Sequence, residues 1–380
     1  MHDPFPPQFL ALLACGLAAP ALADSHFPIQ PDAGFDRWLA RFRPRAKARG
    51  ISAATLDSAF AQAGFIPAVI EKDRGQFELN LSMEDYLAIT VSDERIRKGR
   101  AALARHAALL RQVEASYGVE PHVIAAVWGI ESFYGAKRGT VNTIAALATL
   151  AYEGRRAAFF EDQLIAALKI LQRGDVTPQR MLGGWAGAMG HTQFIPTTFA
   201  AYGVDFRGDG RRDIWSDDPT DALASGANYL AKSGWRHGSR WGAEVVRQGE
   251  GYRLAEGGKL PAKGKVVQPQ KGGPLFILWH NASVMARYNG AQKYVIALGH
   301  LSDRIKGAGP LVAGFPPDEY GLTQAQRVEL QQRLTRLGLD CGSVDGVFGP
   351  KTRAAIRSFQ QSRGLPVDGT PSAALLQALR

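Results

Sequence analysis

Apolar side chains recur at helical spacing through the first half of the chain. Intervals of three or four residues, which place side chains on one face of a helix, separate Phe35, Trp38, Leu39 and Phe42. The stretch 101–113 combines Ala, Leu and Arg, and 143–150 is a run of apolar helix formers. Residues 35–173 are therefore predicted to be helical.

The pattern changes in the second half. A Gly-rich loop interrupts the helical signal at 183–196, and helical spacing returns at 221–232 and 276–305. Between them, 234–274 is rich in Gly and Lys and contains short alternating segments, which predict a small β excursion with loops. The whole pattern indicates a mainly α protein.

The C-terminal residues predict a separate small unit. Residues 307–317 (GAGPLVAGFPP) have the composition of a linker, with Gly and Pro and no charge. After them, Thr323 and Gln326 stand at the spacing of a helix capping box. Two further helices are predicted, at 351–363 and 371–379.

The first 23 residues are typical of a secretory signal. Their apolar run, 9–22, closes with small residues up to Ala23 and is followed by a charge. A domain helix is the weaker alternative because Pro20 would interrupt it. Cys15 also resembles a lipidation site, but the apolar stretch before it is short, so lipid anchoring is the less favoured interpretation. After cleavage Cys341 would be the single cysteine, which excludes an internal disulfide.

Composition excludes several classes of protein. The 380 residues suffice for two or three domains, and 46% hydrophobic with 21% charged side chains is typical of a globular chain. No apolar run reaches the roughly 20 residues that would span a bilayer. The 45 Lys and Arg residues exceed the 35 Asp and Glu residues, for a net charge of +10. This excess favours a polyanion: nucleic acid, an anionic membrane surface or an acidic wall polymer.

Glu131 is the candidate for acid–base chemistry. It lies in a predicted helix, 121–134, at positions i, i+3 and i+7 with Ile124 and Val127, so it shares their apolar stripe. A carboxylate on such a stripe is costly unless it is paired or protonated. Because burial raises the pKa of a carboxyl group, the position suits a general acid. A surface glutamate, or one paired with a basic helix, is the alternative.

Two longer motifs carry a family resemblance. Residues 129–135 (GIESFYG) and 183–196 (GGWAGAMGHTQFIP) resemble motifs of the lytic murein transglycosylase B family, glycoside hydrolase family 103. The similarity spans about 35–305, and residues 322–379 resemble a three-helix peptidoglycan-binding module. Further matches are Arg155, Arg156, Asn228, Tyr229, Arg287, Tyr288, Asn289 and Tyr294.

The resemblance implies a lysozyme-like, α-rich catalytic core. Enzymes of this family cleave the β-1,4 bond between N-acetylmuramic acid and N-acetylglucosamine without water, because the muramyl O6 attacks its own C1 and leaves a 1,6-anhydro ring. Glu131 matches the single catalytic glutamate, which protonates the leaving oxygen and then accepts the O6 proton. The substrate's N-acetyl carbonyl meets the charge at C1, so no second carboxylate and no cofactor is required.

The resemblance also implies substrate contacts. Two adjacent arginines, Arg155 and Arg156, are candidates to bind stem-peptide carboxylates; a solvated helix start is the alternative. For the tyrosines among the cleft residues, the alternative is half-buried core packing. The residues expected to line the glycan cleft are Gln193, Tyr229, Tyr288, Asn289 and Tyr294.

The segment 205–213 (DFRGDGRRD) resembles a calcium loop of some relatives. Its candidate metal ligands are Asp205, Asp209 and Asp213. Arg207, however, brings a positive charge to the third position, and Ser216 stands where an EF-hand carries Glu. A structural calcium ion is one interpretation, and an Asx-turn loop capped by its own aspartates is the other.

We therefore expect an exported, periplasmic lytic transglycosylase that acts on peptidoglycan glycan strands, with proteins of cell-wall synthesis or hydrolysis as further candidate partners. A hydrolytic muramidase on the same scaffold and a non-catalytic wall-binding protein are the alternatives, and Glu131 argues against the second. Nucleic-acid binding fits the charge alone, and the export signal argues against it. The predicted divisions are a signal peptide at 1–23, a catalytic domain at 28–306, a linker at 307–320 and a peptidoglycan-binding domain at 321–380.

Overall fold

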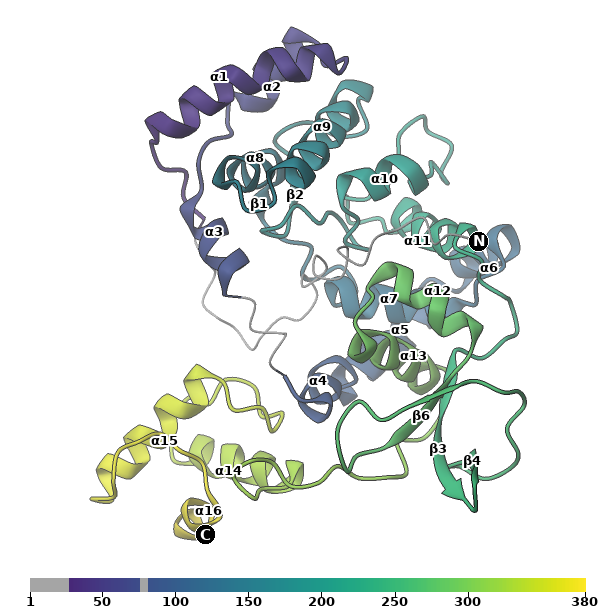
Figure 1. Cartoon of the computed structure of the whole chain (residues 1–380), viewed down its shortest axis with the longest axis vertical. Coiled ribbons are helices and arrows are strands. Elements are labelled where there is room, and N and C mark those ends of the chain that lie inside the picture. Colours follow the sequence, from purple (N-terminus) through teal and green to yellow (C-terminus); the bar gives the residue numbers. More distant parts are fainter. Residues whose placement is uncertain (1–26, 76–80) are drawn as a thin grey trace.

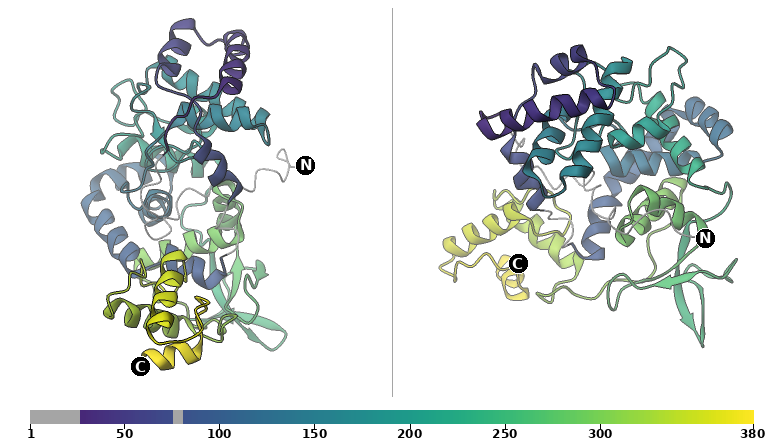
Figure 2. Two further views of the ribbon diagram at one scale, coloured as in Figure 1. Left: turned by 90° about the vertical axis from the view of Figure 1, so that its left-hand side faces the viewer. Right: turned by 45° about the horizontal axis from the view of Figure 1, so that its top comes forward.

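The computed structural model of the chain describes residues 27–75 and 81–380. The predicted signal peptide and Cys15 lie outside these residues. Within them, no helix combines the length and the apolar character needed to cross a membrane. Figure 1 and Figure 2 show a largely helical molecule, with α1 (Ala33–Ala48) and α2 (Ala53–Phe60) at one end of its longest axis and the C-terminal helices at the other. The prediction of a mainly α fold is confirmed.

Serine residues cap the N-termini of several helices in the first half of the chain. Ser52, Ser82 and Ser92 each accept a backbone N–H from the first turn, which satisfies a donor that helix geometry leaves unpaired. The helices that follow α2 are α3 (Pro67–Arg74), α4 (Met83–Thr90), α5 (Asp93–Arg105), α6 (Ala107–Tyr117), α7 (Pro121–Ser132), α8 (Thr143–Glu153) and α9 (Ala157–Arg173). A short strand, β1 (Val141–Asn142), precedes α8 and pairs antiparallel with β2 (Leu182–Gly183).

Helix α7 occupies the centre of the main core. Pro121 begins it, and every residue from Val123 to Ser132 is buried, so the helix is enclosed on all sides rather than along one stripe. The sequence predicted that it would continue to Tyr134. It ends two residues earlier because Phe133 and Tyr134 adopt left-handed backbone conformations, with φ of 52° and 59°.

A small antiparallel sheet follows α10 (Pro196–Tyr202) and α11 (Thr220–Lys232). Its strands β3 (Gly242–Gln248), β4 (Gly251–Leu254), β5 (Lys265–Val267) and β6 (Leu275–Leu278) lie in the order β4-β3-β6-β5. The β excursion is confirmed, but the helical prediction from 276 onward was wrong at its start. Phe276 packs into the main core and Ile277 into a second cluster, the alternation of a strand with two covered faces. Helices α12 (His280–Tyr288) and α13 (Gln292–Lys306) come after it.

The C-terminal unit has its own small core. Its helices are α14 (Gln324–Arg336), α15 (Pro350–Ser362) and α16 (Ala373–Leu379). The capping box is confirmed: the Thr323 side chain accepts the N–H of Gln326, whose side chain accepts the N–H of Thr323. Cys341 is a free, buried thiol within this core, which also contains Leu330, Leu334, Ile356, Phe359, Leu375 and Leu376.

This unit is packed against the rest of the molecule. Arg327 of α14 is buried and forms ion pairs with Glu84 and Asp85 of α4. The segment with the composition of a linker also lies against the main domain, because the Glu244 carboxylate accepts the backbone N–H groups of Val312 and Ala313, each over 2.7 Å. The Gly and Pro content that indicates a linker does not prevent the segment from being held at defined points.

Candidate active site

Glu131 lies on the last turn of α7 and is 1% exposed. Tyr294 of α13 donates a hydrogen bond from its hydroxyl group to Oε1 of Glu131 over 2.5 Å. The two helices pack together, so a carboxyl group from one is positioned by a hydroxyl group from the other. A buried carboxyl group with a fixed orientation is the arrangement that a general acid requires.

Three of the predicted cleft tyrosines form a cluster that includes the hydrogen-bonded Tyr294. Tyr288 and Tyr294 lie nearly parallel with ring centroids 6.5 Å apart, and Tyr229 meets Tyr288 edge-on at 5.2 Å. Burial first, and the neighbouring charge of Glu131 second, raise the pKa of Tyr288 and of Tyr294 well above the ordinary value of 10. Both rings are therefore neutral hydrogen-bond donors at physiological pH. The Tyr288 hydroxyl donates to the Thr192 carbonyl over 2.5 Å, which joins the cluster to the Gly-rich loop.

The turn after Glu131 has an unusual backbone. Two successive non-glycine residues, Phe133 and Tyr134, have positive φ, which costs about 1–3 kcal/mol each and is concentrated at functional sites. Contacts with α5 and α7 hold the turn: the Tyr134 hydroxyl donates to the Arg95 carbonyl over 2.7 Å, and the Arg95 guanidinium donates to the Gly129 carbonyl. Gly129 is required here, since a Cβ atom at that position would lie 2.6 Å from the Tyr134 hydroxyl. The motif residues beside Glu131 thus fix where the carboxyl group stands.

A buried histidine joins the Gly-rich loop to α7. The Trp128 indole N–H donates to Nδ1 of His191 over 3.1 Å, and because an indole can only donate, the ring proton of His191 lies on Nε2. That nitrogen lies 2.7 Å from the Ser216 carbonyl, its acceptor. Burial lowers the pKa of His191 from 6.5 to about 4. The Ser132 hydroxyl, next to Glu131, donates to the His191 carbonyl over 2.6 Å.

Gln193 is buried inside its own loop. Its amide nitrogen donates to the Gly190 carbonyl over 2.8 Å and to the Arg138 carbonyl over 3.0 Å, and its φ is 49°. The side-chain amide therefore shapes the loop, and a contact between Gln193 and the glycan stays a prediction. The loop is tightly packed around Gly190, where a Cβ atom would lie 2.3 Å from the Ile214 carbonyl oxygen.

The other predicted contact residues lie in two further places. Asn289 ends α12, and its side-chain oxygen accepts the N–H of Ala291 over 3.0 Å. Arg155 and Arg156 both pair with the buried carboxylate of Asp73 on α3. The two arginines are therefore not a freely solvated helix start, although about half of the Arg155 side chain stays exposed, and their contact with stem-peptide carboxylates stays a prediction.

The loop at 205–213 does not have the geometry of a calcium site. Both carboxylate oxygens of Asp205 accept backbone N–H groups of their own turn, from Gly208 and Gly210 over 2.7 Å each. Among residues 27–75 and 81–380, no group of three or more Asp, Glu, His or Cys side chains is placed to hold a metal ion. The assignment of Asp205, Asp209 and Asp213 as metal ligands therefore does not fit, and the Asx-turn alternative does.

Sequence reasoning missed two residues of the site. His191 lies inside the 183–196 motif, so the signal was available, but its role depends on Trp128 and on the later residue Ser216. Arg95 has no local signal, because it is one of many basic residues in α5 and its burial depends on the packing of α5 against α7.

Comparison with known proteins agrees with this geometry. The sequence model of the transglycosylase SLT domain matches residues 34–303, and a peptidoglycan binding domain model matches residues 323–379. The membrane-bound lytic murein transglycosylase B of Escherichia coli (strain K12) is 29% identical over 238 residues, which are 57% of this chain and 65% of that protein.

Two solved structures from Pseudomonas aeruginosa are similar over most of this chain. SltB3, in complex with NAG-NAM-pentapeptide, has 45% identity and a TM-score of 0.73, with 92% of this chain and 100% of that chain covered. The soluble lytic transglycosylase SltB1 has 29% identity and a TM-score of 0.64, with 71% of this chain and 100% of that chain covered. With a family match that includes α7, the Gly-rich loop and α13, the chain belongs to the transglycosylase SLT domain family and carries a C-terminal peptidoglycan binding domain.

Proposed function

We propose that this protein is a lytic transglycosylase of peptidoglycan. It cleaves the β-1,4 bond between N-acetylmuramic acid and N-acetylglucosamine and leaves 1,6-anhydromuramic acid ends. The observation that carries the proposal is the buried carboxyl group of Glu131, held by Tyr294 within a domain of this family. The names of the relatives support the same reaction, as does a second SltB3 complex with NAG-anhNAM-pentapeptide.

Glu131 supplies both proton transfers in this proposal. Its carboxylic acid protonates the glycosidic oxygen as the bond to C1 breaks, and the N-acetyl carbonyl oxygen of the same sugar meets the positive charge at C1. The Glu131 carboxylate then accepts the proton of the C6 hydroxyl group as O6 bonds to C1. The acid is regenerated and no water is consumed, so neither a second carboxylate nor a cofactor takes part.

In this proposal the remaining site residues position the Glu131 carboxyl group or bind the substrate. Tyr294 orients the Glu131 carboxyl group and is a positioning residue. Gln193, Tyr229, Tyr288 and Asn289 shape the glycan cleft, Gln193 through the backbone of its loop. Arg155 contacts stem-peptide carboxylates with its exposed part, while Arg156 helps to hold Asp73.

The chain is proposed to act outside the cytoplasm, where its substrate lies. We propose the divisions 1–23 for a signal peptide, 28–306 for the catalytic domain, 307–320 for the connecting segment and 321–380 for the peptidoglycan-binding domain. The last unit binds the wall polymer and raises the substrate concentration near Glu131. A periplasmic location and protein partners in cell-wall synthesis or hydrolysis stay predictions.

The decisive experiment is mass spectrometry of the products from purified sacculi. Anhydro ends are lighter than hydrolysed ends by one water, roughly 18 Da. The Glu131→Gln variant should release no products while its binding to sacculi is unchanged, because the amide has the same shape but no acidic proton. Glu94→Gln is the matched control, since Glu94 is exposed and pairs with Lys98 on the surface of α5. Hydrolysed ends would instead identify a muramidase, and full activity of Glu131→Gln would refute the assignment.

A further inference from the structure

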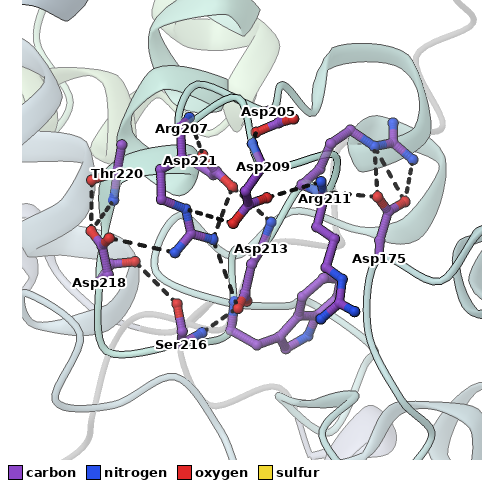
Figure 3. Close-up of polar contacts among 12 residues, drawn as sticks. Asp175, Asp205, Arg207, Asp209, Arg211, Asp213, Ser216, Asp218, Thr220 and Asp221 are labelled. Atoms are coloured by element: carbon purple, nitrogen blue, oxygen red, sulfur yellow. Dashed lines mark hydrogen bonds and ion pairs between the residues drawn. The ribbon is translucent and has the colours of Figure 1, made fainter.

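The acidic loop between α10 and α11 is built around an arginine. The guanidinium of Arg207 lies within 3.2 Å of the Asp221 carboxylate and 3.4 Å of that of Asp218. Asp209 and Asp213 are at 3.7 and 3.9 Å. Figure 3 shows the guanidinium in the middle of these four carboxylates, of which Asp221 belongs to the first turn of α11 and the others to the loop. Three-quarters of the Arg207 side chain is buried.

The carboxylate oxygens are already bonded to N–H groups. Asp221, which is fully buried, accepts the backbone N–H of Phe206 over 3.0 Å and that of Asp213 over 2.9 Å, besides the Arg207 side chain. Calcium requires six to eight oxygen ligands directed at one point. Here the oxygens are directed at N–H donors and at the planar guanidinium, whose five donors suit several carboxylates at once.

The loop also supports the region around Glu131. The side chain of Asp213 accepts the backbone N–H groups of Trp215 and Ser216 over 2.9 and 3.0 Å. The Ser216 carbonyl in turn accepts hydrogen bonds from His191 and from Arg138, each over 2.7 Å. Because His191 is bonded to Trp128 of α7, a displaced loop would release one contact of the helix that carries Glu131.

We propose that Arg207 is the fixed cation of this loop and replaces the divalent metal that the sequence pattern suggests. Its guanidinium offsets part of the negative charge of the four carboxylates from within the chain. The loop therefore keeps its conformation in the absence of calcium. Without Arg207 the same carboxylates would repel one another, and the vacated position would then attract a divalent cation.

The test compares melting temperatures of the full-length protein in EDTA and in excess calcium chloride. The wild type should melt at the same temperature in both, and titration calorimetry with calcium chloride should show no saturable binding. Arg207→Asn should melt roughly 5 °C lower in EDTA, because a mostly buried ion-pair cluster loses its cation. Calcium should restore part of that loss, since Asn offers an oxygen where the guanidinium stood.

Arg211→Asn is the matched control, with the same substitution and the same charge change on an exposed side chain of the same loop. It should melt like the wild type in both buffers. Arg207→Lys keeps the charge without the planar donor set, and its melting temperature in EDTA should lie between those of Arg207→Asn and Arg211→Asn. A saturable rise in the melting temperature of the wild type with calcium would overturn the proposal. So would an Arg207→Asn protein that melts like Arg211→Asn. If Arg207→Asn does not fold in EDTA, its recovery in calcium supports the proposal, and a failure to recover together with a calcium-responsive wild type refutes it.

Discussion

Replacement of Arg327 by methionine should release the C-terminal unit from the main domain. Arg327 is 5% exposed and forms ion pairs with Glu84, 9% exposed, and with Asp85 over 2.9 Å. Asp318 lies 3.7 Å away. Methionine fills a similar volume without charge, so Arg327→Met leaves buried carboxylates at the junction without their cation. This is the costly way to break a buried ion pair.

The size of the effect follows from burial. Loss of one partner of a buried pair costs about 3–5 kcal/mol. Burial already raises the pKa of Glu84 above its ordinary value, so Glu84 can take up a proton once Arg327 is gone. That protonation limits the cost to the lower end, about 3 kcal/mol. The docking equilibrium should then shift about 100-fold toward the released unit.

Limited proteolysis and small-angle X-ray scattering measure this equilibrium. Cleavage within 307–320 should become faster and the radius of gyration should increase. Arg333→Met is the matched control, because Arg333 lies on the same helix and pairs with Glu329 inside the unit, on a partly exposed surface where such pairs contribute less than about 1 kcal/mol. If Arg327→Met and Arg333→Met are cleaved at equal rates, the buried ion pair does not hold the two parts together. Equal activity of wild type and Arg327→Met on soluble glycans, with weaker binding to sacculi, would show that docking serves wall binding rather than catalysis.

Three further predictions concern single side chains. Tyr294→Phe removes a hydrogen bond to the Glu131 carboxyl group, worth about 0.5–1.5 kcal/mol for an uncharged acid, so kcat for glycan cleavage should fall about 2- to 10-fold with KM unchanged. An unaltered kcat would show that the hydroxyl does not position Glu131. Burial lowers the pKa of His191 to about 4, so the contribution of its neutral ring to the free energy of unfolding is fully present above pH 6.5 and is lost as the pH falls through about 4. In thermal melts, His191→Asn should therefore lose less stability than the wild type between pH 6.5 and pH 4. Identical pH profiles of the two proteins would contradict this. Burial raises the pKa of Asp303 from 3.8 to about 6, so ionisation destabilises the fold as the pH rises through about 6. Asp303→Asn, which still accepts the bond from Trp241, should therefore be more stable than the wild type at pH 8 by up to about 3 kcal/mol and equal to it below pH 4; a variant that is less stable at pH 8 would refute this.

Local patterns were sufficient for most of the elements and for the residue at the centre of the site. The capping box at Thr323, the proline that begins α7 and the alternating segments of the sheet each depend on atoms within a few residues, so spacing and residue type predict them. Glu131 was found from its place on an apolar stripe, and the motif around it from its resemblance to a known family. Its two left-handed residues were not, because contacts of Tyr134 with Arg95 on the neighbouring helix α5, and of Arg95 with the Gly129 carbonyl, stabilise that turn against its intrinsic cost.

Tertiary structure decided which side chains meet. Tyr294 and Glu131 are 163 residues apart and Arg327 and Glu84 are 243 apart, so no local pattern pairs them. The sequence by itself determined that Arg207 stands in the third position of a calcium-like loop, but the fold determined that its guanidinium lies inward among carboxylates instead of in solvent. The periodicity of apolar residues in the sequence indicates which face of a helix or strand is apolar. The partner of a charged or polar group on that face is chosen by how distant elements pack, because desolvation makes each buried charge depend on the group placed opposite it.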